Sequence, residues 1–450
     1  MLEWINKYVL GAAVPLCLLG VGIYYTVALR FFPFTRLRTI FGYFAKGEKQ
    51  EGTSPLRALS LALAGTLGVG NIVGVSSAIY LGGFGAIFWM WMSALAAMIL
   101  KYAEIVLAMR HRRREGGGFR GGAPYYIRDI FTARGLPRLG AAVAIVFAVL
   151  CIADALFMGC IIQVNAVSSS LSGVLSVPPL LSGAVLAVIC FLLLSVGEGN
   201  VGAVTEKLVP LMSLGYVVLS LFCIFLRRGD LWWALGKIFA DAFRIESAAG
   251  GIFGFLFSRA LRFGSMRGLL SNEAGCGTSP IAHASSSAKS PVEQGFFGLV
   301  EVFVDTILLC SMTALVVVLN YDAASAFGED PMMMTLRAYS ASFSDGAAVA
   351  VEAFLAVAVL LFGFATLICW AHYGIESLAY LSPRRGVRQG FVLVYCLFAV
   401  IGAVSAPSSV WTAADLAIGA MTLINVAVLF LGRREVRRET FLYFGFDEKR

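Results

Sequence analysis

Long apolar runs, separated by short polar and basic segments, dominate the hydrophobic pattern of this chain. Eleven of the runs are long enough to cross a bilayer, since a membrane-spanning helix needs roughly 20 apolar residues. The strands of an outer-membrane barrel would instead alternate over about ten positions, so the pattern predicts an all-α polytopic membrane protein. The predicted spans are residues 8–30, 58–81, 84–108, 139–169, 180–197, 204–226, 247–263, 296–319, 348–380, 387–404 and 409–431.

Glycine interrupts two of these spans. Residues 65–85, GTLGVGNIVGVSSAIYLGGFG, hold seven glycines in the second span, and Gly250, Gly251 and Gly254 interrupt the seventh. Glycine is costly inside a helix. Open backbone at membrane depth is tolerated only where it is buried in protein or lines a watery cavity. The second span is therefore predicted to be a broken helix that holds a solute and an ion.

The chemistry of such a break is specific. The first half-helix ends in unpaired carbonyl groups, which suit a sodium ion, and the second half begins with free amides, which suit a carboxylate. Thr66 and Asn71 add side-chain oxygens beside the break. The alternative is close helix packing, because Gly70 and Gly74 form a GxxxG pair. The residues alone weigh about equally for the two interpretations.

Composition and charge fix the setting. Hydrophobic residues make up 59% of the chain and charged residues 14%, which excludes an ordinary soluble domain. With the N-terminus outside, 28 Lys and Arg fall in inner segments and 6 in outer ones, which supports that orientation. Basic inner loops facing anionic lipid then explain the net charge of +8 without a nucleic acid. The N-terminus lacks the basic region of a signal peptide, so the first span is expected to be retained.

Polar residues in other spans are candidate partners of the break. In the ninth span Thr366, Trp370 and Tyr373 share one helix face. The alternative is aromatic packing, with Thr366 bonded to its own i−4 carbonyl. In the fourth span Gln163 and Asn165 point in opposite directions, and Asn165 is expected to form a hydrogen bond between helices.

Carboxylates within spans are costly, so each is a candidate functional group. We expect Glu104 to pair with Lys101 at i−3. Glu301 and Asp305 are expected to be structural or gating groups, neutralised by an arginine of the polar segment before them. That segment, with residues 271–284, is expected to be a loop at the inner face. No GxSxG or HExxH motif is present, so an enzyme is not predicted. The candidate carboxylates within spans are Asp154, Glu301, Asp305, Glu352, Glu376 and Asp415. The arginines that could neutralise Glu301 and Asp305 are Arg259, Arg262 and Arg267.

Two long motifs resemble the alanine or glycine:cation symporter family: GTLGVGNIVGVSSAIYLGGFGAIFWMWMSAL, followed by KYAE at residues 101–104, and RGLLSNEAGCGTSPIAHA at residues 267–284. The resemblance implies a LeuT-type five-plus-five inverted repeat, spans 2–6 and 7–11, preceded by one peripheral helix. Spans 2 and 7 would be broken. The expected organisation is a single transporter domain over 1–450, with a peripheral first helix and inner loop (1–57), repeats at 58–226 and 247–431, and a cytoplasmic tail (432–450).

The resemblance also implies the function: sodium-coupled symport of a small neutral amino acid, alanine or glycine, by a multi-pass protein of the cell membrane that works as a monomer without a cofactor. Proton coupling and, less strongly, a channel are the alternatives. Position 69 is often Thr in the family and is Val69 here, which leaves only its backbone as a ligand. The implied substrate residues are Thr66, Gly68, Gly70, Asn71, Gln163, Phe253 and Trp370, and the implied sodium ligands are Gly65, Leu67, Gly68 and Thr366.

Overall fold

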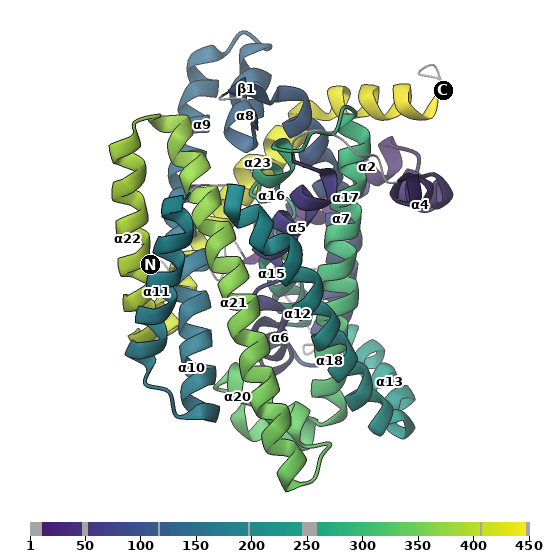
Figure 1. Ribbon diagram of the computed structural model, residues 1–450. Coiled ribbons are helices and arrows are strands. Elements are labelled where there is room, and N and C mark those ends of the chain that lie inside the picture. Colours follow the sequence, from purple (N-terminus) through teal and green to yellow (C-terminus); the bar gives the residue numbers. More distant parts are fainter. Residues whose placement is uncertain are drawn as a thin grey trace.

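Helices form almost every element of the computed structural model (Figure 1), which describes residues 11–46, 53–115, 118–196, 199–244, 259–405 and 407–446. Within these residues, seven helices are long and apolar enough to cross a membrane. Shorter apolar helices lie at Ala13–Ala28, Val73–Gly82 and Pro179–Ser195. The prediction of an all-helical membrane protein is confirmed. The seven long helices are Gly85–His111, Pro137–Leu175, Val201–Leu226, Pro291–Leu319, Asp345–Leu381, Arg385–Val404 and Thr412–Phe444.

The second predicted span is a discontinuous helix, as expected. Its first half, α5 (Pro55–Thr66), begins at the capping hydroxyl of Ser54 with proline at its first turn. The chain then extends at Gly68, makes a short 3₁₀ turn, η2 (Val69–Asn71), and continues as α6 (Val73–Gly82). The break thus lies inside the glycine-rich segment, and Gly83, with a φ of 77°, forms the turn that follows α6.

A second discontinuous helix lies elsewhere than predicted. It consists of α15 (Arg259–Asn272) and α16 (Ser279–Ala284), separated by residues 273–278, where Glu273, Gly275 and Gly277 have positive φ angles of 52°, 85° and 83°. The prediction of a loop over residues 271–284 is wrong, because residues 271–272 end α15, residues 279–284 form α16, and the polar side chains among them, such as Ser271, Thr278 and Ser279, are buried in the protein. The predicted break at residues 250–254, and most of the predicted span 247–263, lie outside the described residues.

The remaining spans follow the hydrophobic pattern closely, with two differences. The fourth and eighth spans each contain a π-helical stretch, and the last helix runs on to Phe444, so the predicted tail is largely helical. The helices are α2 (Gly11–Ala28), α7 (Gly85–His111), α9 (Pro137–Leu156), η3 (Phe157–Ile162), α10 (Gln163–Leu175), α11 (Pro179–Val196), α12 (Gly199–Leu226), α17 (Pro291–Val302), η5 (Phe303–Cys310), α18 (Ser311–Leu319), α21 (Asp345–Leu381), α22 (Arg385–Val404) and α23 (Pro407–Phe444).

Short elements join the spans at both ends of the molecule. At the end that carries α8 (Ala123–Thr132), β1 (Arg113–Glu115) and β2 (Gly118–Arg120) form an antiparallel hairpin. At the other end lie α13 (Leu231–Ala242) and α20 (Pro331–Ser340) (Figure 1). The others are α3 (Phe32–Thr35), α4 (Leu37–Lys46), η4 (Arg228–Asp230), α19 (Tyr321–Ala324) and η6 (Ser325–Phe327).

The two discontinuous helices lie at the centre of the bundle, where α5 and α6 pack against α12, α15 and α21, and α15 packs along α7 (Figure 1). The approach of α15 to α7 is so close that a Cβ at Gly264 would lie 2.2 Å from the carbonyl oxygen of Ala86. Large apolar side chains such as Leu211, Leu214 and Leu393 are exposed on the outer helices α12 and α22. These surfaces suit lipid, whereas the broken backbone is shielded by protein.

Candidate substrate and cation site

The end of α5 faces α21 directly. The Thr366 hydroxyl donates a hydrogen bond to the carbonyl of Ala64 at 2.9 Å, and the Cys369 thiol donates to the carbonyl of Leu61 at 3.0 Å. The alternative in which Thr366 bonds its own i−4 carbonyl is therefore wrong. The hydroxyl of Thr66 instead turns back onto Ala62 and Leu63 of its own helix. Thr366 thus adds a hydroxyl oxygen to the carbonyl-rich end of α5.

Gly68 is the tightest point of the break. A Cβ on this residue would lie 2.7 Å from Oγ1 of Thr366 and 2.9 Å from Oε1 of Gln163. Real Cβ contacts are longer than this, so the absence of a side chain lets three elements meet. Gly65 is similarly close to Tyr373 and Cys369, with contacts of 3.0–3.1 Å. Glycine therefore serves close approach at the break.

Gln163 holds the unwound segment in place. Its Oε1 accepts a hydrogen bond from the amide of Val69 at 3.1 Å, and its Nε2 donates to the carbonyl of Met158 at 3.2 Å. Both ends of the side-chain amide are thus engaged within the protein, and its contact with a substrate stays a prediction. Asn165 points away and donates to the carbonyls of Gly402 and Ser405, which confirms the predicted hydrogen bond between helices.

Asn71 belongs to a buried cluster of oxygen atoms. Its Nδ2 donates to Oδ1 of Asp305 at 2.7 Å. The hydroxyls of Ser271 and Thr306 both donate to Oδ2 of Asp305 at 2.7 Å. Oδ1 of Asn71 is buried and has no hydrogen-bond partner among the described residues. A carboxylate beside amide and hydroxyl oxygens is the ligand type that hard cations prefer.

Trp370 connects α21 to the break of the second discontinuous helix. Its Nε1 donates to Oε1 of Glu273 at 3.0 Å, and Oε2 of the same carboxylate accepts from Thr278 at 2.7 Å. The Trp370 side chain also packs tightly against η3, since a Cβ built on Gly159 would lie 2.2 Å from the Cβ of Trp370. Trp370 is fully buried, so it forms a fixed wall between the two breaks.

Lys101 neutralises a different carboxylate from the one predicted. Its Nζ lies 3.2 Å from Oε1 of Glu301. The hydroxyl of Ser279 donates to both oxygens of this carboxylate, and Nε2 of His283 lies 3.1 Å from Oε2. Glu104 instead accepts from the amide of Gly277 at 3.0 Å and from the side chain of Asn425. The predicted Lys101–Glu104 pair is wrong, because Lys101 reaches Glu301 while Glu104 turns toward the second break.

The expectation that Arg259, Arg262 or Arg267 neutralises Glu301 and Asp305 is also wrong. Glu301 is served by Lys101 on α7, and Asp305 by uncharged donors. Sequence reasoning missed Glu273, Ser271 and the role of this whole motif. The signal was present, since two glycines next to polar residues in residues 271–278 repeat the feature that marked the first break.

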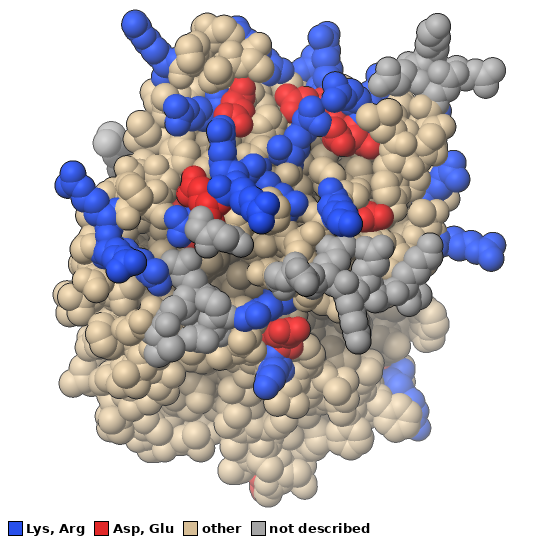
Figure 2. Space-filling view, turned by 45° about the horizontal axis from the view of Figure 1, so that its top comes forward, with Lys and Arg blue, Asp and Glu red and all other residues tan. Residues whose placement is uncertain are grey.

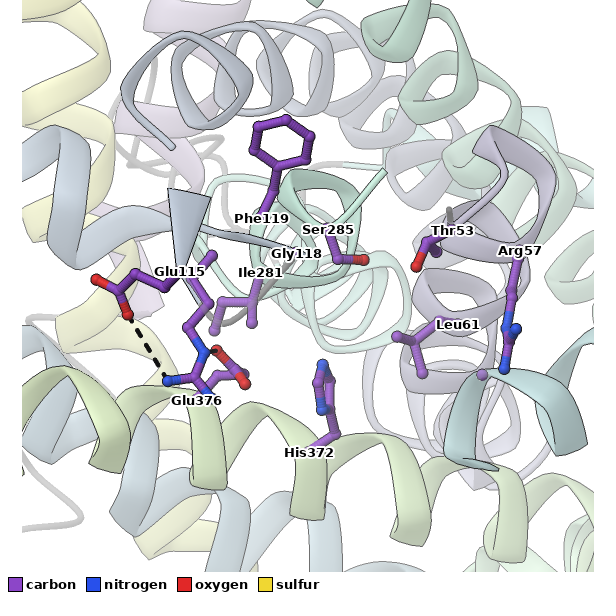
Figure 3. Close-up of a pocket in the computed structure, with 12 residues that line it drawn as sticks. Thr53, Arg57, Leu61, Glu115, Gly118, Phe119, Ile281, Ser285, His372 and Glu376 are labelled. Carbon is purple, nitrogen blue, oxygen red and sulfur yellow. Dashed lines mark ion pairs between the residues drawn. The ribbon is translucent and has the colours of Figure 1, made fainter. Parts of the chain in front are cut away.

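A cavity of about 470 Å³ opens beside the first turns of α5. In Figure 3 His372 and Glu376 of α21 point into it, opposite Arg57 and the β1–β2 hairpin. Arg120 of the hairpin lies 3.5 Å from Glu376 and 3.8 Å from Glu115. The hairpin is therefore tied to α21 across the mouth of this cavity.

A second cavity, of about 430 Å³, lies beside α6 and is lined by Gly74, Ser77 and Arg267 among others. Nothing lies within 4 Å of a Cβ built on Gly74, so the close-packing interpretation fails at this glycine. Thr366 and Trp370 are buried and line neither of these two cavities. The region between the breaks is thus closed from both.

The other predicted site residues occupy less informative positions. Gly70 lies in η2, where a Cβ would be in ordinary contact, at 3.8 Å, with Leu270 and Ser271 of α15. Leu67 ends α5, and its amide donates to the carbonyl of Leu63. Phe253 lies outside the described residues. The roles predicted for these residues stay predictions.

Comparison with known proteins agrees with this architecture. The chain is 33% identical over 447 residues to the sodium/alanine symporter AgcS of Methanococcus maripaludis, covering 98% of this chain and 96% of that protein. It is 31% identical over 417 residues to the probable sodium/glutamine symporter GlnT of Bacillus subtilis, covering 92% and 84%. Among solved structures it resembles a manganese transporter of Eremococcus coleocola, with a TM-score of 0.55, 16% identity, and coverage of 88% of this chain and 81% of that one.

The structural likeness confirms the LeuT-like fold, and it supports the fold alone at this identity. The family comparison goes further, because the sodium:alanine symporter family matches residues 1–449. The resemblance inferred from the two sequence motifs is thereby confirmed, and the chain belongs to the sodium:alanine symporter family.

Proposed function

We propose that this protein carries a small neutral amino acid, alanine or glycine, into the cell together with sodium. Its family makes it a sodium-coupled amino-acid symporter and not an enzyme. The observation that carries the proposal is the meeting of the carbonyl end of α5 with the Thr366 hydroxyl, 2.9 Å from the Ala64 oxygen, next to the open backbone at Gly68.

Sodium is proposed to bind at the end of α5. Carbonyl groups of Gly65, Leu67 and Gly68 and the hydroxyl of Thr366 are the expected ligands, since half-helix C-termini in transporters coordinate sodium in this way. The cluster of Asn71 and Asp305 offers oxygens for a second cation. Ion and substrate would then share one unwound segment, which couples their binding.

The substrate is proposed to lie between the two breaks, near Thr66, Gly70, Asn71, Gln163 and Trp370. The tight packing at Gly68 and the Trp370 indole bonded to Glu273 support a small substrate, alanine or glycine, in this part of the bundle. The names of the relatives include alanine and glutamine, so a glutamine-sized substrate is the alternative that the contacts disfavour.

Eleven crossings, one peripheral helix followed by two inverted repeats of five, fit the helices that the structure describes. The crossings are α2, α5–α6, α7, α9–α10, α11, α12, α15–α16, α17–α18, α21, α22 and α23. In Figure 1, α5 and α16 lie toward the end of the molecule that carries α8, whereas α6 and α15 lie toward the other end. The two broken helices therefore run in opposite directions, as inverted repeats require.

The orientation is proposed from charge. Figure 2 shows Lys and Arg side chains gathered over the end that carries β1 and α8, and fewer of them toward the opposite end. Because cytoplasmic loops carry the excess of Lys and Arg, we place this end inside the cell, with the N-terminus outside and the C-terminus cytoplasmic.

The test is uptake of labelled alanine into proteoliposomes under a sodium gradient, a proton gradient or neither, with unlabelled glycine and glutamine as competitors. We expect uptake that saturates with alanine, requires sodium and is inhibited by glycine more strongly than by glutamine. Thr366→Val keeps the shape of the side chain and removes its hydroxyl, so it should raise the sodium concentration for half-maximal uptake. Uptake indifferent to sodium would contradict the proposal.

A further inference from the structure

Asp154 is a buried carboxylate outside the substrate and sodium site described above. It lies on α9, three residues before the π-helical stretch η3, and its exposure is 0%. Neither of its carboxylate oxygens has a hydrogen-bond partner within the described residues. Glu273, Glu301 and Asp305 differ in this respect, because each accepts at least two hydrogen bonds. Asp154 is thus buried without the donors that an ionised carboxylate needs.

The charged groups that act on Asp154 are acidic. They are Glu273, at the break of the second discontinuous helix, and Asp415 on α23, while Cys151 is the titratable neighbour one turn earlier on α9. On α21, which packs along α9, Gly374 meets Ala155, and the titratable residues beside it are His372, Tyr373 and Glu376. The two groups that act on Asp154 itself, Glu273 and Asp415, are both negative when ionised.

Physical chemistry then restricts the state of Asp154. An ionised carboxylate without a cation or hydrogen-bond donors is strongly disfavoured away from water, and such a group takes up a proton instead. Intramembrane carboxylates of this kind mark ion and proton pathways in transporters.

The position of Asp154 links it to the substrate region. The next residue, Ala155, packs against α21 at Gly374. A Cβ built on Gly374 would lie 3.2 Å from the Cβ of Ala155. One turn further along, Gly159 of η3 presses on Trp370, which in turn donates to the second break. π-helical stretches inside α-helices occur frequently at functional sites. The contact between α9 and α21 therefore lies beside both the buried Asp154 and the Trp370 wall.

We propose that Asp154 is a proton-binding site, and that it must carry a proton for α9 and α21 to close around the occupied substrate site. This inference rests on the proposed function, to which it adds a proton bound at a site separate from the sodium ligands. Loss of the proton leaves an unpaired charge in the closed interface, so it favours a conformation in which water reaches α9. The uptake rate then depends on pH at constant sodium.

The test measures sodium-driven uptake of labelled alanine against pH in proteoliposomes. Above the pH at which Asp154 titrates, wild-type uptake should fall by up to about tenfold per pH unit. Asp154→Asn keeps the shape and fixes the neutral form, so its uptake should lose this dependence on pH. Asp154→Glu keeps an ionisable group and should keep the dependence. The matched control is Glu352→Gln, which removes a carboxylate paired with Arg337 at 2.8 Å and should follow the wild type.

Infrared spectroscopy gives a second readout that does not require an active variant. The wild type should show the carbonyl band of a protonated carboxylic acid, and this band should shift in Asp154→Glu. Its absence from the wild type overturns the inference. A wild-type pH profile in Asp154→Asn also overturns it, as does a raised sodium requirement with unchanged pH dependence, since Asp154 would then bind sodium.

The two proposals fail in distinguishable ways. Absence of sodium-driven uptake by the wild type at every pH contradicts the proposed symport. Sodium-driven uptake that is flat over pH in the wild type contradicts only the role of Asp154.

Discussion

Gly68→Ala is the substitution whose consequence the structure defines most closely. The backbone at Gly68 has a φ of −106° and a ψ of −162°, which alanine adopts without strain. The obstacle is space, because the new methyl group would lie 2.7 Å from Oγ1 of Thr366 and 2.9 Å from Oε1 of Gln163. Both side chains belong to the hydrogen bonds that hold the break. The methyl group can therefore be accommodated only by moving one of them.

The cost follows from these contacts. Overpacking of a tight interior costs about 1–3 kcal/mol, and each hydrogen bond that is lost, from Thr366 to Ala64 or from Val69 to Gln163, costs about 1 kcal/mol more. If about 2 kcal/mol of this falls on the sodium-bound state, sodium affinity drops by roughly 30-fold. We expect Gly68→Ala to insert into the membrane and to lose most sodium-dependent uptake.

Gly74→Ala is the matched control in the same discontinuous helix. A Cβ there meets nothing within 4 Å, and alanine is favoured over glycine inside a helix by up to about 1 kcal/mol. Sodium-dependence curves and melting temperatures in detergent should be measured for both variants. Wild-type sodium affinity in Gly68→Ala, or equal losses in the two variants, would refute the reasoning that the break is packed to its limit at Gly68.

Three further substitutions test separate parts of the molecule. Lys101→Met removes one partner of the buried pair with Glu301 and should lower stability by about 3–5 kcal/mol, measured as a drop in melting temperature that Glu301→Gln partly restores. Trp370→Phe keeps an aromatic wall but leaves Oε1 of Glu273 without its donor. This should cost about 1–3 kcal/mol and lower uptake more than it lowers expression, and unchanged uptake would show that the bond is dispensable. Arg120→Ala removes partly exposed ion pairs worth less than about 1 kcal/mol, so it should leave the melting temperature unchanged. A cysteine placed in the cavity lined by Arg57 and His372 should then react faster with a thiol reagent. An unchanged labelling rate would argue against a closing role for the hairpin.

Local patterns in the chain determined the membrane setting, the helical class and the first break. Each depends on neighbouring residues: runs of about 20 apolar side chains, and glycines crowded into residues 65–71. The same rule, applied to residues 271–278, predicts the second break. The polar and small residues of that segment favour a loop when they are considered without the packing around them.

Only the tertiary structure decided which buried charges meet. Lys101 and Glu104 lie on one helix, but their partners come from positions 200 and more than 300 residues away, at Glu301 and Asn425. Helix periodicity fixes which face a side chain occupies, whereas the packing of α7 against α16, α17 and α23 fixes what lies opposite that face. The sequence by itself therefore marked residues 65–71 as either opened backbone or a packing face, and long-range packing decided that the chain extends at Gly68 and that Thr366 and Gln163 close around it.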